Sequence, residues 1–253
     1  MKHDFEDIEI KRDAPRILEE QLRRKRKPCM VATGAMCDPY ILLENELLIT
    51  RRCLELIESY GFGLAIQTKS ARILRDLDIL TAINRKTKCV VEMTLTTFDE
   101  DLCHIVEPNV STTAERFAAL EVFRDVGIPT VVWLSPFLPF INDTEENLRG
   151  LIDYCVRAKV NAILCFSFGM TLREGNREYF YAKLDEHFPT GLKERYIKTF
   201  GDSYECRSPN NDKLWAILQR ECRENGIMCG TDSVFAYMRT FESKTSQLSL
   251  FDV

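Results

Sequence analysis

Residues 62–70 read FGLAIQTKS, and this stretch contains the pattern that decides the fold. Its first part, residues 62–68, is almost continuously apolar, which is typical of a strand covered on both faces of a sheet. Ser70 follows at once and is a residue type that caps helices. Beyond it, apolar residues recur at helical spacing, at Ile73, Leu74, Leu77, Leu80 and Ile83. The stretch therefore predicts a strand that leads directly into a helix.

The same strand–helix unit recurs along the chain. Further strands are predicted at residues 28–33, 89–97, 129–135 and 161–166. Helices are predicted at residues 14–24 and 44–60, and after the capping-box patterns Thr112-x-x-Glu115 and Asp143-x-x-Glu146. This regular alternation predicts parallel βαβ units and places the chain in the α/β class.

A doubly wound sheet and an open barrel both fit this alternation. Polar residues gather just after the strands, at Cys37 and Asp38, Lys69, Thr96 and Thr97, Ser135 and Asn142, and Ser167. Barrels of this class keep their chemistry at that edge, so the polar residues favour the barrel. Solvent exposure of the connecting loops is the alternative explanation for any single one of them.

The alternation stops near Met170, which suggests three regions. Residues 1–170 are predicted to form the barrel, and residues 171–239 a helical cap packed on it. The cap is expected to contain a helix at residues 213–224. Residues 240–253 are polar and are predicted to form a flexible tail.

Composition narrows the class of protein. A net charge of −5 argues against a broad polyanion-binding surface. The chain has no apolar run of roughly 18 residues and begins with charged residues, so no membrane partner and no secretory signal are predicted. Its 10 cysteines lack the spacing of a small disulfide scaffold and indicate reduced thiols in the cytoplasm.

Several motifs occur in the order and at the spacing of successive βα units. They are TGAMCDPY at 33–40, QTKS at 67–70, Glu107-Pro108 with Arg116, PFLPFINDTEEN at 136–147, SFGMTLR at 167–173 and YECRSPN at 204–210. From about Phe5 to Gly230 the chain resembles the spore photoproduct lyase-like family of radical S-adenosylmethionine (SAM) enzymes. The resemblance implies a partial (β/α)6 barrel, bound SAM and a [4Fe-4S] cluster. It also implies possible action on nucleic acid, in repair or modification.

The chain departs from this family at the cluster. The family holds the cluster with a C-x3-C-x2-C triplet, and no three cysteines of this chain have that spacing. The chain therefore resembles a member that lacks the first strand and the cluster loop. It is predicted to hold no metal and to be inactive as given. A truncated gene model, a misassigned start codon and a non-catalytic protein are equally compatible with the sequence.

The resemblance implies the SAM-binding residues. It places the loop from Gly34 to Asp38 near the methionine end of SAM, and Lys69 near the SAM carboxylate. Arg116 matches an arginine that reaches SAM or braces Glu107. Thr94 and Thr96 are the favoured hydroxyl donors, because residues two apart on a strand share a face.

Two cysteines are candidate catalytic thiols. Cys37 lies in the first loop, but Ala35 occupies the position where the lyases carry their hydrogen-donating cysteine, so the repair chemistry is not implied. Cys206 is followed by Arg207, which predicts a lowered thiol pKa. A purely structural role is the alternative for each.

Two further segments suggest partners. The tail residues 247–251, QLSLF, resemble the pentapeptide that binds the bacterial sliding clamp, with Gln247, Leu248, Leu250 and Phe251 as contacts. The basic run RRKRK at 23–27 is a candidate nucleic-acid patch or a solvated helix end. The hypotheses are therefore a SAM-binding part of a radical enzyme, a non-catalytic barrel tethered to the clamp, and an unrelated α/β-barrel enzyme.

Overall fold

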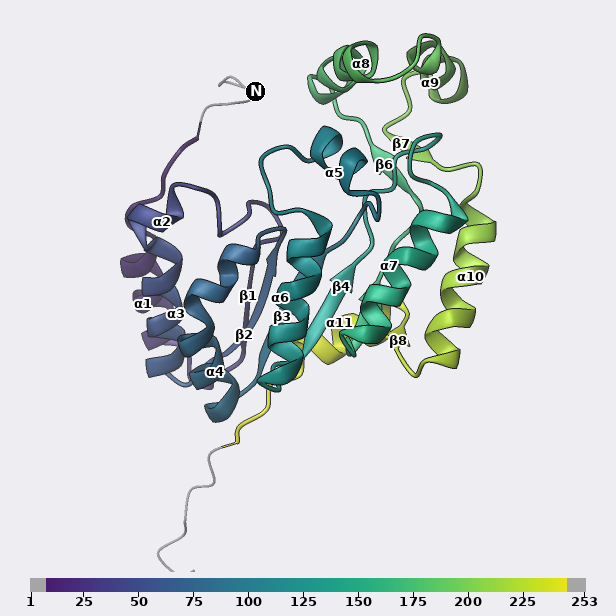
Figure 1. The fold of residues 1–253 in the computed structure, drawn as a ribbon. Helices are drawn as coiled ribbons and strands as arrows, with labels where there is room; N and C mark the ends of the chain where they lie inside the picture. Colours follow the sequence, from purple (N-terminus) through teal and green to yellow (C-terminus); the bar gives the residue numbers. More distant parts are fainter. Residues whose placement is uncertain (1–7, 245–253) are drawn as a thin grey trace, which may run out of the picture.

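The computed structural model describes residues 8–244, and its centre is one parallel sheet. The strand order is β1-β2-β3-β4-β5-β8, and every neighbouring pair is parallel. The strands are β1 (Met30–Thr33), β2 (Gly63–Thr68), β3 (Cys89–Thr94), β4 (Thr130–Trp133), β5 (Ala162–Leu164) and β8 (Met228–Cys229). This succession of strands confirms the α/β class and is consistent with a partial barrel (Figure 1).

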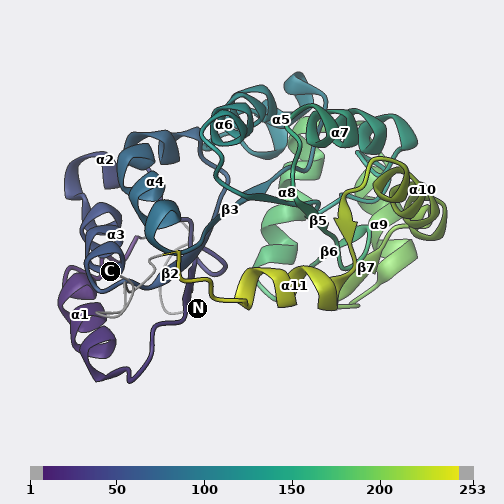
Figure 2. The ribbon, with the colours of Figure 1, turned by 90° about the horizontal axis from the view of Figure 1, so that it is seen from below.

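Helices alternate with the strands, and most of them cover the outer face of the sheet. They are α1 (Ala14–Arg24), α2 (Glu44–Leu47), α3 (Ile49–Ser59), the 3-10 helix η1 (Ala71–Asp76), α4 (Leu77–Lys86), α5 (Glu100–Val106), α6 (Thr113–Asp125), α7 (Glu145–Arg157) and α10 (Asn211–Glu224). Seen from below in Figure 2, α11 (Thr231–Arg239) crosses the other face of the sheet.

The two faces of the sheet bury separate apolar clusters because strand side chains alternate. The larger cluster joins residues such as Ile66 and Val91 to the outer helices. The smaller cluster lies on the inner face, where Val90 and Val131 pack against Val234 and Met238 of α11. The smaller cluster covers only part of the inner face, and the rest of that face borders a cavity.

Capping residues in the sequence predicted most helix starts correctly. The side chain of Ser70 accepts a hydrogen bond from the backbone of Arg72, and Thr112 and Glu115 form the predicted capping box. The start predicted at Asp143 was wrong by one residue. Thr144 caps α7, whereas Asp143 accepts hydrogen bonds from the backbone of Phe140 and the hydroxyl of Ser208.

The predicted extents of one helix and of the sheet need correction. The single helix predicted at residues 44–60 is two helices, because Leu48 adopts a left-handed conformation with φ +54°. The sheet also does not end at residue 170, since β8 pairs with β5 and α11 follows it. A strand of two residues has no periodicity that the sequence could reveal.

The remaining part of the predicted cap stands above the carboxyl edge of the sheet. It comprises the antiparallel hairpin of β6 (Gly169–Thr171) and β7 (Glu205–Arg207), with α8 (Asn176–His187) and α9 (Leu192–Phe200) between its strands. Figure 1 shows α8 and α9 at the opposite end of the molecule from the segment that follows α11.

The first residues of the predicted tail are held against the barrel. The backbone nitrogen of Lys244 donates to the carbonyl of Lys86, and Glu242 forms an ion pair with Lys88. The QLSLF segment lies outside the described residues. Across residues 8–244, no helix combines the length and the apolar character that crossing a membrane requires.

Candidate functional site

The loops after β1 and β2 are fastened together by Asp38. Its carboxylate accepts hydrogen bonds from the Thr68 hydroxyl at 2.7 Å and from the backbone nitrogens of Lys69 and Tyr40 at 2.7 and 2.8 Å. The carboxylate therefore fixes the position from which the Lys69 side chain starts. Asp38 therefore contributes to the site by holding the two loops together through these hydrogen bonds.

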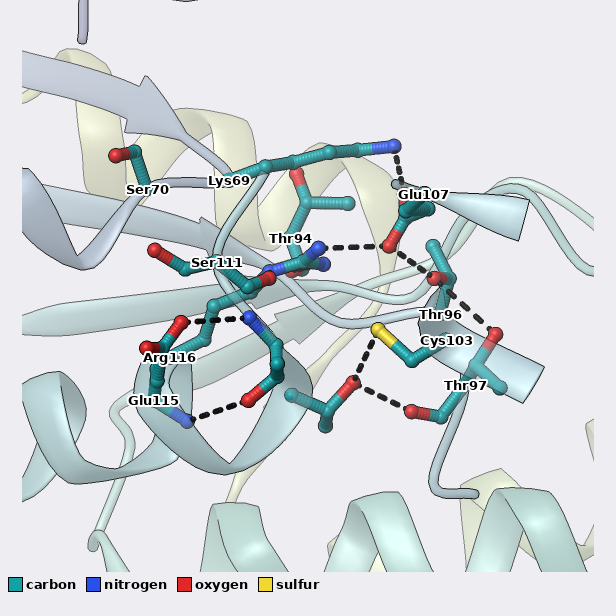
Figure 3. Close-up of polar contacts among 12 residues, drawn as sticks. Lys69, Ser70, Thr94, Thr96, Thr97, Cys103, Glu107, Ser111, Glu115 and Arg116 are labelled. Atoms are coloured by element: carbon teal, nitrogen blue, oxygen red, sulfur yellow. Dashed lines mark hydrogen bonds and ion pairs between the residues drawn. The ribbon is translucent and has the colours of Figure 1, made fainter. Parts of the chain in front are cut away.

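Glu107 is the centre of a second polar cluster (Figure 3). One carboxylate oxygen forms an ion pair with the ammonium of Lys69. The other accepts from Arg116 at 2.7 Å and from the Thr96 hydroxyl at 3.0 Å. Three segments that are distant in sequence thus meet at the end of α5, on the carboxyl edge of the sheet.

Arg116 is fully buried and its guanidinium is occupied within the protein. It donates to the carbonyls of Ser111 and Thr94, at 2.8 and 3.0 Å, as well as to Glu107. Of the two roles that the resemblance implied for Arg116, this geometry supports bracing Glu107. Arg116 can therefore act on a ligand only indirectly, by holding Glu107, which in turn holds the ammonium of Lys69.

Burial raises the pKa of Glu107, but the neighbouring charges of Lys69 and Arg116 outweigh burial and hold the pKa below its usual value. Glu107 is therefore an anion that neutralises two cations. The Lys69 side chain keeps about a third of its surface exposed, so its ammonium can reach a ligand while it stays paired.

The threonines at the end of β3 are buried in the same region. The Thr94 hydroxyl accepts from the Gln67 side chain at 3.3 Å. The backbone carbonyl of Thr96 accepts from the side chains of Asn142 and Asn147, each at 3.0 Å. These contacts hold the ends of β2, β3 and the loop after β4 in one layer.

A cavity of about 620 Å³ lies on the inner face of the sheet. It opens at the loop after β1, where Gly34 and Cys37 line it, and it extends along Gln67 and Glu92 to α11. The backbone of Gly34 lies so close to β2 that a Cβ atom there would be 1.9 Å from the Gln67 carbonyl oxygen. With its φ of +97°, this position requires glycine.

Glu92 gives this cavity an unusual carboxyl group. Its side chain is buried and accepts a hydrogen bond from the Trp133 indole at 2.6 Å. Burial raises the pKa of Glu92, and the Trp133 hydrogen bond offsets part of this effect. A cationic ligand in the cavity would favour the ionised form of Glu92. Sequence reasoning missed both residues because they lie within two predicted strands, β3 and β4, and it sought functional residues only after the strand ends.

A second cavity, of about 710 Å³, lies under the hairpin of β6 and β7. Its lining includes Phe166, Cys206 and Trp215. Phe166 stands between the two cavities, because its ring is 5.7 Å from that of Trp133 and 6.1 Å from that of Phe235, which both line the first cavity. The two cavities are therefore neighbours with an aromatic boundary.

The two candidate thiols do not meet. Cys37 is exposed and lines the first cavity, whereas Cys206 is buried and lines the second. The lowered pKa predicted for Cys206 is wrong, because burial raises its pKa, although Arg177 opposes the change. Arg207 instead forms an ion pair with Asp212.

The polar residues expected around one shared cavity are arranged differently. Asp38 and Lys69 lie at the same edge of the sheet, as the barrel requires. However, none of the five lines either cavity, so the prediction of one shared cavity is wrong. Thr96, Arg116 and Asn142 are instead buried in the framework. Among residues 8–244, no three histidine, cysteine or acidic side chains are placed to hold a metal ion.

No protein-family model matches this chain. It is 26% identical to the uncharacterized protein ORF301 of Acidianus two-tailed virus over 178 residues, which cover 68% of this chain and 58% of ORF301. It is 27% identical to the uncharacterized protein MJ0683 of Methanocaldococcus jannaschii over 128 residues, which cover 51% and 48%. The chain thus spans about half the length of these curated relatives.

Solved structures show what the fold is similar to. A mutant of spore photoproduct lyase, with bound SAM and dinucleoside spore photoproduct, matches with a TM-score of 0.60 at 13% identity, over 86% of this chain and 65% of the lyase. SuiB of Streptococcus suis, bound to SAM, matches with a TM-score of 0.52 at 12% identity, over 90% and 45%. The chain therefore has the partial-barrel fold of radical SAM enzymes.

Proposed function

We propose that this chain is the SAM-binding portion of a radical SAM enzyme of the spore photoproduct lyase-like type. The observation that carries the proposal is the 620 Å³ cavity on the inner face of the sheet, which opens at the Gly34 loop. Its volume lies within the roughly 300–1,000 Å³ that is typical of small-molecule sites. The SAM-bound neighbours of the same fold support this assignment.

The chemistry of the cavity fits SAM. SAM carries a positive sulfonium and a positive amino group, and the cavity offers the Glu92 carboxyl group and the aromatic rings of Trp133 and Phe235. Aromatic faces attract cations, and the same rings can stack on the adenine. By the family resemblance, Lys69 is the candidate partner of the SAM carboxylate. It lies at the carboxyl edge and not in the cavity lining, and the Glu107 pair holds its ammonium in place.

SAM supplies a hydrogen-abstracting radical when an iron–sulfur cluster reduces it. The described residues do not fit such a cluster, since they contain no group of three suitable ligands and the sequence contains no C-x3-C-x2-C triplet. The part played by this chain is to bind and orient SAM and to exclude water.

The second cavity is the proposed substrate site. It adjoins the SAM cavity across Phe166 and is closed above by the β6–β7 hairpin. A substrate there would lie next to the cofactor, as hydrogen abstraction requires. We propose nucleic acid as the substrate class, because the similar lyase structure holds a dinucleoside spore photoproduct.

Calorimetric titration with SAM tests the proposal. We expect SAM to bind more tightly than S-adenosylhomocysteine, which lacks the sulfonium charge, and Glu92→Gln to weaken SAM binding by about tenfold, or about 1.4 kcal/mol. Glu205→Gln, which removes a carboxylate from the second cavity, is the matched control and should leave SAM affinity unchanged. Absence of SAM binding by the folded protein would refute the assignment.

A second candidate, a non-catalytic barrel tethered to the sliding clamp, is favoured by the missing cluster ligands. A Leu250→Ala/Phe251→Ala variant should then lose a micromolar affinity for the clamp while its thermal melt stays unchanged. A lowered melting temperature in that variant would mean that the tail stabilises the fold, and it would count against the tether.

A further inference from the structure

The amino edge of the sheet carries a group of basic side chains, none of which lines either cavity. We name as the basic face the side chains of Arg24, Lys25, Arg26, Lys27, Arg85 and Lys86. They come from the end of α1, the segment before β1, and the end of α4. Helices that follow parallel strands run back to the amino edge, so their carboxyl ends meet there.

Hydrogen bonds join these segments into one surface. Lys86 donates to the carbonyl of Glu58 at 2.9 Å, at the end of α3. Two residues further on, the Tyr60 hydroxyl accepts from Arg23 at 2.7 Å, at the end of α1. The basic run at 23–27 is therefore attached to a neighbouring basic helix end, which the sequence could not show.

The segment that follows α11 passes over the same surface. The Lys244 ammonium donates to the Asn84 carbonyl at 2.7 Å, and its backbone nitrogen donates to Lys86 at 3.0 Å. Figure 1 shows this segment leaving the barrel beside the lower end of α4. Lys244 thereby adds another cation to the basic face.

The helix dipole explains only part of this charge. Arg24 and Arg85 lie in last turns, where cations are stabilised by the dipole. Lys25, Arg26 and Lys27 lie beyond the helix and are exposed. Within residues 8–244, no ion pair involves these three side chains, although the whole chain has a net charge of −5. Lys86 pairs with Glu58, but the unpaired cations at residues 25–27, gathered on one face of an acidic protein, indicate an anionic partner.

We propose that the basic face binds the sugar–phosphate backbone of nucleic acid. Nucleic acid is favoured over an anionic membrane because the face contributes no exposed large apolar side chain that could enter a lipid surface. Backbone binding requires exposed lysine and arginine and no base contacts. This surface is separate from both cavities, so the inference does not depend on SAM binding.

Fluorescence anisotropy with a labelled 30-base-pair duplex tests the proposal on the full chain. Lys25→Gln/Arg26→Gln/Lys27→Gln should weaken binding by at least about tenfold near 0.1 M salt. It should also reduce the slope of log affinity against log salt by about 2–3, as expected for three lost phosphate contacts. All three side chains are exposed, so an unchanged thermal melt shows that folding is intact.

The control variant removes the same charge from the opposite end. Lys183→Gln/Lys193→Gln/Lys198→Gln changes α8 and α9 and should alter the affinity less than twofold. Equal weakening by both variants would reduce the effect to net charge and overturn the proposal. So would undetectable duplex binding, or wild-type binding to phosphatidylserine vesicles that depends on residues 25–27 while the duplex does not bind.

Discussion

The carboxylate of Asp38 accepts a hydrogen bond from the backbone nitrogen of Lys69 at 2.7 Å, across 31 positions of sequence. This contact joins the loop after β1 to the loop after β2 and sets where the Lys69 side chain begins. Lys69 then reaches Glu107, which Arg116 holds from α6. The edge of the sheet is thus ordered by the backbone hydrogen bond to Asp38 and by the ion pairs of Glu107 with Lys69 and Arg116.

Removing the Asp38 carboxylate should loosen this edge. Asp38→Ala leaves two backbone nitrogens and the Thr68 hydroxyl without their acceptor, so we expect a loss of about 2–4 kcal/mol in the free energy of unfolding. Asp38→Asn retains one oxygen acceptor and should lose less. Urea denaturation of the three proteins measures the order. An alanine variant as stable as the wild type would show that the hydrogen bonds to Asp38 contribute nothing to the free energy of unfolding.

Glu107 should contribute strongly to the free energy of unfolding at neutral pH. Glu107→Gln leaves Lys69 and the buried Arg116 without their anion, and we expect a cost of about 3–5 kcal/mol. Because the folded-state pKa of Glu107 is lowered, its contribution is complete above the ordinary value of 4.5 and is lost as the pH falls through the lowered value. The difference between wild type and variant should therefore narrow in acid. Glu186→Gln, which breaks an exposed pair with Lys183, is the control and should change stability little.

Gly34 should not tolerate a side chain. Gly34→Ala places its Cβ against the Gln67 carbonyl and should cost more than about 3 kcal/mol. Gly127 has a φ of +72° but open space around it, so Gly127→Ala isolates the conformational cost, of about 1–2 kcal/mol. Thermal melts compare the two variants. Equal losses of stability in the two variants would mean that the close approach of the Gly34 backbone to β2 does not exclude a side chain.

Glu92 should make stability depend on pH in the opposite direction to Glu107. Its folded-state pKa is raised, so the wild type loses stability as the pH rises from about the ordinary 4.5 through the raised value. Glu92→Gln does not titrate and still offers an oxygen to Trp133. We expect this variant to melt higher than the wild type near pH 8, with the gain absent near pH 4. A gain that does not vary with pH would contradict the raised pKa.

Local sequence was sufficient to predict the elements that bear the site. The alternation of apolar strands with helical stripes, the Ser70 and Thr112 caps, and the polar residues after each strand all depend on residues within one turn or one strand of each other. Such patterns survive without any knowledge of packing. They established the α/β class, the parallel sheet and the edge at which Asp38 and Lys69 lie.

The tertiary structure decided what these residues contact. The pairing of Lys69 with Glu107 spans 38 positions, and Lys244 joins the basic face by reaching Asn84 across 160. The position of β8, the raised pKa of Glu92 and the buried state of Cys206 likewise follow from packing between distant segments. Periodicity in the sequence indicates which face of a helix or strand is buried. It does not indicate which residue from a distant segment packs against that face. That neighbour sets the charge and the pKa of a side chain, and it is fixed only when the sheet forms.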